Sequence, residues 1–355
     1  MKMKIAILPG DGIGKEIISE AIKVLKSIER KFNHKFEFTA GIIGAAAIDK
    51  TGNPLPDETL EICLSSDAIL FGAIGDPKYD NDPNAKVRPE QGLLKMRKSL
   101  GLFANIRPVK SYKALFNSSP LKNHLLDDLD FIVYRELTGG IYFGEKGRKQ
   151  KNYFAFDVCS YNKDEILRIT KLAFEAAKNR KQKVTLVDKA NVLETSRLWR
   201  ETVKNYSLAF PEIELEFMFV DNAAMQIIQN PKRFDVILTE NMFGDILTDE
   251  ASVITGSLGM LPSASVGNKI SLYEPIHGSF PEGTGKNIAN PVATILSAAM
   301  MLDMSFNLKA ESNAIIEAVE NSLLNEVTTP DINSIKKYST SDVGNYISNY
   351  IDNAV

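Results

Sequence analysis

The chain has 355 residues, of which 44% are hydrophobic and 25% charged, as in globular proteins of one or two domains. Its 42 basic and 45 acidic side chains give a net charge of -3, which excludes nucleic-acid binding driven by a basic face. Cys63 and Cys159 form no CxxC motif, which excludes a disulfide framework and a cysteine zinc site. We therefore expect a protein of the reducing cytoplasm. No apolar run approaches the ~18 residues of a membrane span, so we expect no membrane partner.

Short β-type runs alternate with longer amphipathic patterns along the chain. This alternation predicts an α/β fold with a largely parallel sheet core. Strands are expected over residues 4–8, 35–40, 68–72, 130–135, 184–187, 215–220 and 235–239. Helices are expected over residues 15–28, 164–177, 242–251, 289–302 and 312–324.

Unusual polar residues follow the C-terminal ends of several predicted strands. In open α/β sheets that edge is where ligands bind, so we expect the functional site there. The residues concerned are Gly10-Asp11-Gly12, Asp188-Lys189, Asp221-Asn222 and Glu240-Asn241.

The glycine-rich segment 10–14 lies between a predicted strand and a predicted helix. Its spacing is GxGxG, not GxGxxG, and no acidic strand end follows about 20 residues later. This argues against an ordinary Rossmann site and favours a tight turn with some ligand contact. Residues 75–89 are predicted to form a functional loop. The segment 273–291 is rich in Gly, Pro, Ser and Thr, as in loops that wrap a nucleotide.

Three arginines and three aspartates are candidate ligand-binding groups. Arg97, Arg107 and Arg135 have the fork that binds carboxylates, although surface arginines often do no more than contact water. Asp245 and Asp249 are four residues apart and share one helix face, which indicates either a cation site or an exposed acidic face. Asp221 is a third oxygen donor, and such ligands suit Mg²⁺ or Mn²⁺.

Tyr142 and Lys189 are candidate proton-transfer groups. The two glycines at 139 and 140 hold Tyr142 at a fixed place, although a core tyrosine is the simpler interpretation. Lys189 follows an apolar strand, where a lowered pKa would suit a base, whereas a surface lysine is the simpler interpretation.

Taken together, the motifs resemble the β-decarboxylating dehydrogenase family of isocitrate and isopropylmalate dehydrogenases, nearly end to end. The segments that carry the resemblance are LPGDGIGKE from Leu8, EQGLLKMRKSLGLFANIRP from Glu90, RELTGGIYFGE from Arg135, VDKANVLETSRLWR from Val187, VDNAAM from Val220, TENMFGDILTDEAS from Thr239, YEPIHGS from Tyr273 and GKNIANP from Gly285. The resemblance implies a two-domain fold with a cleft that closes over ligand. Residues 1–102 and 256–355 would form the cofactor-side domain, and residues 103–255 the substrate and dimerisation domain.

The resemblance also implies roles for individual residues. Lys189 would accept the proton of the substrate hydroxyl, and Tyr142 would protonate the enolate. Arg97, Arg107 and Arg135 would hold the malate carboxylates, Leu93 and Leu94 would face the isopropyl group, and Asp221 would lie at the substrate and the metal. The metal ligands would be Asp221, Asp245 and Asp249, and the NAD-binding residues Ile13, Glu90, His277, Gly278, Ser279, Phe280, Pro281, Glu282 and Asn290.

The implied activity is NAD-dependent and Mg²⁺- or Mn²⁺-dependent oxidative decarboxylation of 3-isopropylmalate to 4-methyl-2-oxopentanoate and CO₂, in leucine biosynthesis, by a homodimer with shared active sites. Isocitrate, homoisocitrate or tartrate as substrate is an alternative, and so is a catalytically silent nucleotide-binding protein. The sequence departs from the family pattern at Phe280, Pro281 and Glu282, where a small residue and Pro-Asp are usual. Glu282 retains an acidic side chain, which suits ribose hydroxyls and repels a 2′-phosphate.

Overall fold

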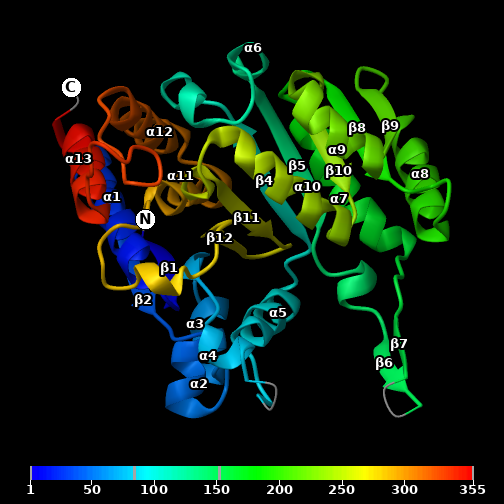
Figure 1. The fold of residues 1–355 in the computed structure, drawn as a ribbon, viewed down its shortest axis with the longest axis horizontal. Helices are drawn as coiled ribbons and strands as arrows, with labels where there is room; N and C mark the ends of the chain where they lie inside the picture. The colour runs from blue at the N-terminus through cyan, green and yellow to red at the C-terminus, as the bar shows by residue number, and fades with distance from the viewer. Residues whose placement is uncertain (1, 83–84, 151–152, 354–355) are drawn as a thin grey trace. The chain divides into compact units, whose positions relative to one another are not determined.

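The computed structural model describes residues 2–82, 85–150 and 153–353. The chain divides into two compact units (Figure 1). The first comprises Met1–Leu102 and Gly256–Val355, and the second comprises Phe103–Thr255. The first unit is therefore assembled from the two ends of the chain.

The first unit is built on a largely parallel sheet. Strand β1 pairs in parallel with β2 and β3, and the central strand β3 also pairs in parallel with β12. Only β11 runs antiparallel to its neighbour, β12. The order is β2 (Lys35–Ala40), β1 (Lys2–Gly10), β3 (Ala68–Ala73), β12 (Ser271–Pro275), β11 (Pro262–Val266). β3 is buried along its whole length, which explains why its residues form an unbroken apolar run.

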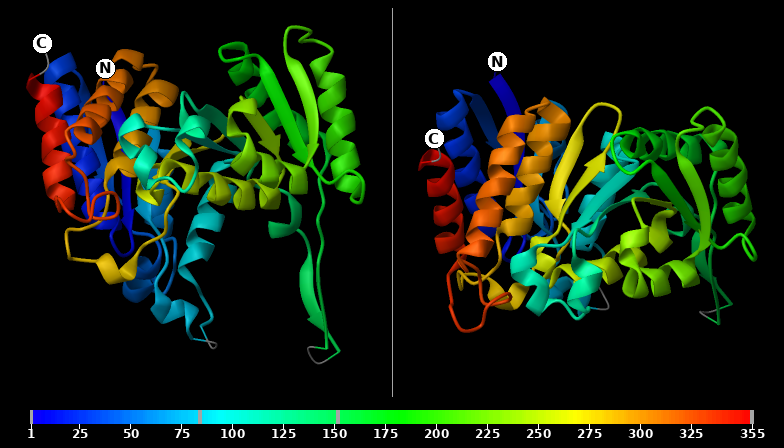
Figure 2. Two further views of the ribbon diagram at one scale, coloured as in Figure 1. Left: turned by 45° about the horizontal axis from the view of Figure 1, so that its top comes forward. Right: turned by 90° about the horizontal axis from the view of Figure 1, so that it is seen from above.

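Helices cover this sheet. α1 (Gly14–Phe32) packs against α13 (Thr340–Asn353) and α11 (Val292–Phe306), and Figures 1 and 2 show α1 and α13 side by side. α11 contacts β3, β11 and β12 on one side and α1 and α12 (Lys309–Leu324) on the others. Since it is enclosed on most sides, its sequence is apolar almost all round. The remaining helices of this unit are α2 (Ala45–Thr51), α3 (Asp57–Leu64), α4 (Pro77–Asp80), α5 (Pro89–Leu100), η5 (Leu258–Met260) and η6 (Pro281–Gly283).

The second unit has a sheet with the order β4 (Ala104–Lys110), β5 (Asp130–Glu136), β10 (Val236–Thr239), β8 (Lys183–Asp188), β9 (Glu214–Phe219). β4 is antiparallel to β5, and the other pairs are parallel. Two helix pairs contact it, α7 (Lys163–Lys178) with α8 (Glu194–Ser207) and α9 (Val220–Gln229) with α10 (Asn241–Ser252). One core joins Phe131, Val187 and Leu247 from β5, β8 and α10. The shorter helices are η1 (Lys113–Ser118), α6 (Asn123–Leu126), η2 (Gly140–Tyr142), η3 (Pro231–Arg233) and η4 (Val253–Thr255).

A separate hairpin belongs to the second unit. β6 (Lys146–Lys149) and β7 (Phe154–Asp157) pair antiparallel and extend away from that unit's sheet (Figures 1 and 2). Tyr153 is 88% exposed and Phe154 50% exposed beside the turn. Among the described residues, none of the helices combines the length and the hydropathy that a membrane crossing requires.

The predicted α/β class with a largely parallel sheet is confirmed. The strand expected over residues 35–40 is β2, residue for residue. The strand expected over residues 215–220 ends one residue earlier, and α9 begins at Val220, which puts Asp221 in a helical first turn where a carboxylate is favourable. The helix expected from residue 289 begins at Val292, because the residue before Pro291 is disfavoured in helical conformation. The loop expected over residues 75–89 contains α4 in its described part, and residues 83–84 lie outside the described residues.

Candidate active site

A carboxylate shared by two donors forms the centre of a polar cluster in the second unit. Arg135, at the end of β5, is 4% exposed, and its guanidinium forms an ion pair with Asp245 Oδ1. The hydroxyl of Tyr142 donates to the other oxygen of Asp245 at 2.8 Å. Arg135 Nη2 also donates to Asn241 Oδ1 at 2.9 Å. The arrangement therefore brings Arg135, Tyr142 and Asp245 together as the sequence suggested.

The turn that carries Tyr142 is fixed by a buried carboxylate. Glu136 is fully buried and accepts hydrogen bonds from Gly139 N at 2.6 Å and Thr138 N at 3.1 Å. Burial, and then the hydrogen bond to Asp245, raises the pKa of Tyr142 to about 12. The phenol is therefore protonated at neutral pH and has a proton to donate.

Arg107 lies within ion-pair distance of both Asp245 and Asp249 on α10. It lies on β4, and its Nη1 donates to Thr248 Oγ1 at 2.6 Å and lies 3.4 Å from Asp249 Oδ1. Its Nη2 lies 3.9 Å from Asp245 Oδ1. Asp245 and Asp249 therefore share one helix face, as their spacing predicted, and this face meets two guanidinium groups.

Lys189 and Asp221 form a pair of their own. Lys189 directly follows β8, and its Nζ donates to Asp221 Oδ1 at 2.6 Å in the first turn of α9. This hydrogen bond lowers the pKa of Asp221. Across residues 2–82, 85–150 and 153–353, no group of three or more His, Cys, Asp or Glu side chains is arranged to hold a metal ion. Within a single chain, Asp245 and Asp249 thus lie on one helix face, whereas Asp221 does not form a group with them.

In the first unit, α5 aligns four of the predicted residues. Glu90, Leu93, Leu94 and Arg97 recur at three- and four-residue spacing, which places them along one helix face. Leu94 is 39% exposed and Leu93 is half-buried. Arg97 Nη2 donates to Glu274 Oε1 at 2.9 Å, whereas its Nε is buried without a partner among the described residues. The helix therefore presents the apolar side chains of Leu93 and Leu94 between the carboxylate of Glu90 and the guanidinium of Arg97.

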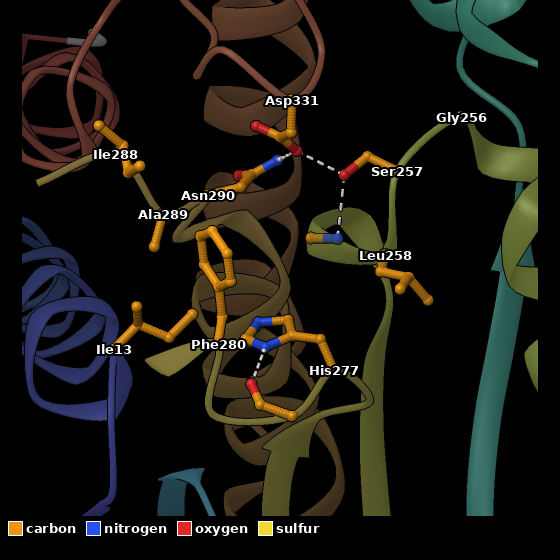
Figure 3. Close-up of a pocket in the computed structure, with 12 residues that line it drawn as sticks. Ile13, Gly256, Ser257, Leu258, His277, Phe280, Ile288, Ala289, Asn290 and Asp331 are labelled. Atoms are coloured by element: carbon orange, nitrogen blue, oxygen red, sulfur yellow. Dashed lines mark hydrogen bonds between the residues drawn. The ribbon is translucent and has the colours of Figure 1, made fainter. Parts of the chain in front are cut away.

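The first unit also contains a cavity of about 510 Å³ (Figure 3). Its walls come from the start of α1, from η5, from the segment after β12 and from the segment before α13. The residues that line it are Ile13, Gly256, Ser257, Leu258, Gly259, His277, Gly278, Phe280, Ile288, Ala289, Asn290 and Asp331.

Two polar features mark the cavity: an imidazole nitrogen of His277 and a hydrogen-bonded group around Asp331. His277 Nδ1 contacts its neighbour's carbonyl at 3.0 Å, whereas Nε2 is buried with no hydrogen-bond partner among the described residues. Burial lowers the pKa of His277, which keeps the imidazole neutral at pH 7. Asp331 Oδ2 accepts from Asn290 Nδ2 at 3.1 Å and from the Ser257 hydroxyl. Apolar walls with an orphaned imidazole nitrogen fit a nucleoside, so these residues suit the adenosine half of a dinucleotide.

Phe280 lines this cavity in a strained conformation. Its φ of 41° is left-handed, which is a rare conformation for a bulky residue, and its side chain is 47% exposed. The ring lies so close to Gly283 that a Cβ at Gly283 would come within 2.4 Å of it. Ile13 N donates to Ser279 O at 2.9 Å and so attaches the start of this loop to α1.

Of the predicted cofactor residues, Ile13, His277, Gly278, Phe280 and Asn290 line the cavity. Ser279 is buried but does not line it, and Pro281 and Glu282 belong to η6 (Pro281–Gly283). Glu90 lies at the start of α5, near Gly75. The sequence reasoning assigned no role to Ser257, Leu258, Ile288, Ala289 or Asp331. Ile288 and Ala289 belong to the GKNIANP motif that carried the resemblance, but the segments of Ser257 and Asp331 have no periodicity to mark them.

Comparison with known proteins defines the class. A profile described as isocitrate/isopropylmalate dehydrogenase matches residues 4–347. The chain belongs to this family and is a decarboxylating dehydrogenase. It is 54% identical to the 3-isopropylmalate dehydrogenase of Bacteroides fragilis strain YCH46, over 100% of both chains. It is 53% identical to that of Bacillus subtilis strain 168, over 96% of this chain and 94% of the relative. The crystal structure of isocitrate dehydrogenase from Methylococcus capsulatus is 31% identical, with a TM-score of 0.89 over 99% of each chain.

The close packing of Arg135 over α10 depends on a glycine and can be tested. A Cβ at Gly244 would lie 2.6 Å from Arg135 Cγ, so Gly244→Ala should push the side chain away from Asp245. Overpacking of this kind costs about 1–3 kcal/mol, against a helix-propensity gain of about 0.5–1 kcal/mol. We expect the free energy of unfolding, measured in urea, to fall by roughly 1–2 kcal/mol. Gly278→Ala is the control, since a Cβ there meets nothing within 4 Å. Equal stability of the two variants would contradict the close approach.

Proposed function

We propose that the chain catalyses NAD- and divalent-metal-dependent oxidative decarboxylation of 3-isopropylmalate to 4-methyl-2-oxopentanoate and CO₂, a step of leucine biosynthesis. The observation that carries the choice of substrate is the apolar Leu93–Leu94 surface beside Arg97 on α5. An isopropyl group suits that surface, whereas the extra carboxylate of isocitrate would be desolvated there with no partner left, because Arg97 would already bind a malate carboxylate. The names of the Bacteroides and Bacillus relatives support the same substrate.

In this proposal Arg97, Arg107 and Arg135 bind the malate carboxylates through their planar forks. Lys189 would accept the hydroxyl proton during oxidation, in its neutral form and once Asp221 is no longer its partner. Tyr142 then donates its proton to the enolate that remains after loss of CO₂. The raised pKa of Tyr142 supports the last role, because the phenol keeps its proton until the carbanionic carbon develops.

The metal would be held by Asp245 and Asp249 together with Asp221 of a second copy. Their oxygen ligands fit Mg²⁺ or Mn²⁺. Such an ion, when bound, polarises the hydroxyl and the ketone that forms from it. Asp221 suits the role because its lowered pKa keeps it ionised.

The cofactor would be NAD, with its adenosine half in the cavity lined by Ile13, His277 and Ile288. His277 Nε2, which has no hydrogen-bond partner in the part of the chain that the structure describes, supports this placement. The Glu282 side chain would repel the 2′-phosphate of NADP. A cytoplasmic location fits the free thiols of Cys63 and Cys159.

A homodimer with shared active sites is supported by two features of the second unit. The first is that Asp221 does not join Asp245 and Asp249 in one chain. The second is the exposed apolar side chains of α9, α10 and η4: Met225 is 52% exposed, Ile246 58% and Val253 52%. A two-fold interface over these helices would bury them and add Lys189 and Asp221 of one copy to Tyr142 and Asp245 of the other.

The choice of substrate is tested by NAD reduction with 3-isopropylmalate, isocitrate, homoisocitrate and tartrate side by side. We expect kcat/KM for 3-isopropylmalate to exceed that for isocitrate by at least about 100-fold, because the carboxylate would be buried unpaired. Smaller alkylmalates should react more slowly by about 10–200-fold per missing methylene. NAD should be preferred to NADP with every substrate. A higher kcat/KM for isocitrate would refute the assignment.

Metal dependence is tested with Asp249→Asn, since Asp249 is exposed and its loss leaves the Arg135–Asp245 pair intact. Removal of one carboxylate charge should raise the Mg²⁺ or Mn²⁺ concentration for half-maximal activity about tenfold or more. Asp164→Asn, an exposed acid of α7, is the control and should have no effect. Chelator should abolish wild-type activity and added metal should restore it. Full activity in excess chelator would eliminate the metal role.

Shared sites are tested by mixing Tyr142→Phe with Lys189→Ala, each inactive as a homodimer. In a mixed dimer one site carries both changes and the other none. Random pairing makes half the dimers mixed, so activity should recover to roughly a quarter of wild type. Mixing Tyr142→Phe with Arg107→Lys is the control, because both groups come from the same copy and no intact site can form. No recovery in a sample proved to contain mixed dimers would rule out sharing.

A further inference from the structure

Glu16 lies outside the cavity of the first unit but holds one of its walls. It is a first-turn acid of α1. Its Oε1 accepts a short hydrogen bond from Gly285 N, and its Oε2 accepts from Asn287 N at 3.2 Å. The wall residues Ile288, Ala289 and Asn290 follow immediately. One carboxylate therefore uses both oxygens to fix the backbone that leads into the cavity wall.

The backbone at this point needs such support. Asn287 has a φ of 54°, and Gly285 a φ of 74°. Asparagine adopts the left-handed region more readily than other residues with a side chain, but the conformation still has a cost that the surrounding contacts offset. The carboxylate of Glu16 supplies part of that support, because hydrogen bonds to a charged acceptor are about twice as strong as neutral ones.

The first residues of α13 also form hydrogen bonds with this turn. Thr340 N donates to Asn287 O at 3.0 Å, and Ser341 N donates to Asn287 Oδ1 at 3.0 Å. The Thr340 hydroxyl donates to Ala289 O at 2.7 Å. Since α1 and α13 pack along one another, residues 285–289 are hydrogen-bonded to the first turns of two helices that are in contact.

We propose that Glu16 is a positioning residue that presets the wall Ile288–Asn290 for the adenosine half of a dinucleotide. Glu16 does not line the cavity, so it acts through the turn it holds. A preformed wall spares the ligand the entropic cost of ordering it, and this raises affinity without altering the chemical step. The inference rests on the proposed use of NAD and deepens it by assigning the affinity for the adenosine half to a residue of α1.

The test compares Glu16→Ala and Glu16→Gln with Glu58→Ala. Glu58 is an exposed first-turn glutamate of α3 in the same unit, so it controls for the loss of a helix-dipole contact. Loss of two charge-assisted hydrogen bonds should raise KM for NAD about tenfold in Glu16→Ala, with kcat and KM for 3-isopropylmalate within about twofold. Glu16→Gln should show a smaller rise, because its amide oxygen still accepts one of the two bonds. Glu58→Ala should match the wild type.

Two measurements do not depend on turnover. Calorimetric binding of adenosine monophosphate should weaken in Glu16→Ala by the same factor as KM for NAD, whereas binding of nicotinamide mononucleotide should not change. Without nucleotide, the amides of Gly285 and Asn287 should exchange with deuterium faster in Glu16→Ala than in Glu58→Ala.

Unchanged NAD and adenosine monophosphate affinity in Glu16→Ala, or unchanged exchange at Gly285 and Asn287, overturns the positioning role. If Glu16→Ala fails to fold, Glu16→Gln decides by the same criteria. A wild type that binds no NAD overturns the proposed function and the inference with it. A wild type that binds NAD as tightly as a Glu16→Ala variant overturns the inference alone.

Discussion

The ion pair between Arg135 and Asp245 is the interaction on which the second unit's polar cluster depends. A guanidinium that is 4% exposed needs a counter-charge, since an unpaired buried charge is strongly destabilising. Asp245 supplies this charge with one oxygen and accepts the Tyr142 hydroxyl with the other. β5, η2 and α10 are thereby tied to a single carboxylate. Under the proposed function, a substrate carboxylate at Arg135 takes over as counter-charge and releases Asp245 for a cation.

Buried carboxylates also fix the turns that carry the two proposed proton-transfer groups. Glu136 holds the amides before Tyr142, and burial raises its pKa against the lowering effect of those amides and Arg168. Asp188 is 2% exposed, pairs with Arg200 Nε at 2.5 Å and accepts Ala190 N at 3.0 Å. Tyr142 and Lys189 therefore each follow a strand that ends in a buried acid, and hydrogen bonds and an arginine hold that acid in place. For Glu136 the raised pKa means that its ionisation disfavours the folded state as the pH rises from 4.5 through the folded value.

The sequence predicted best where local pattern and tertiary environment agree. β2 alternates apolar and polar residues, and its predicted bounds are confirmed. The four-residue spacing of Asp245 and Asp249 correctly predicted that they share one helix face, whereas their approach to Arg107 is found only in the structure. The sequence predicts no helix over residues 89–100, because Gly92 and the exposed Leu94 weaken the amphipathic pattern of α5. Asp331 could not be predicted, since its place in the cavity depends on Asn290 and Ser257, which are distant in sequence. The residue roles came from the resemblance, because single residues such as Lys189 look alike in a site and on a surface.

Phe280 and Gly283 constrain one another in a way that limits how this loop can change. The Phe280 ring occupies the space that any side chain at position 283 would need, with a Cβ there only 2.4 Å from it. The two positions therefore form an epistatic pair in which the order of substitutions matters. A smaller residue at 280 makes room for an alanine at 283, whereas beside the present ring that alanine requires Phe280 to move. Related enzymes that have a side chain at the position of Gly283 should accordingly have a small residue at the position of Phe280.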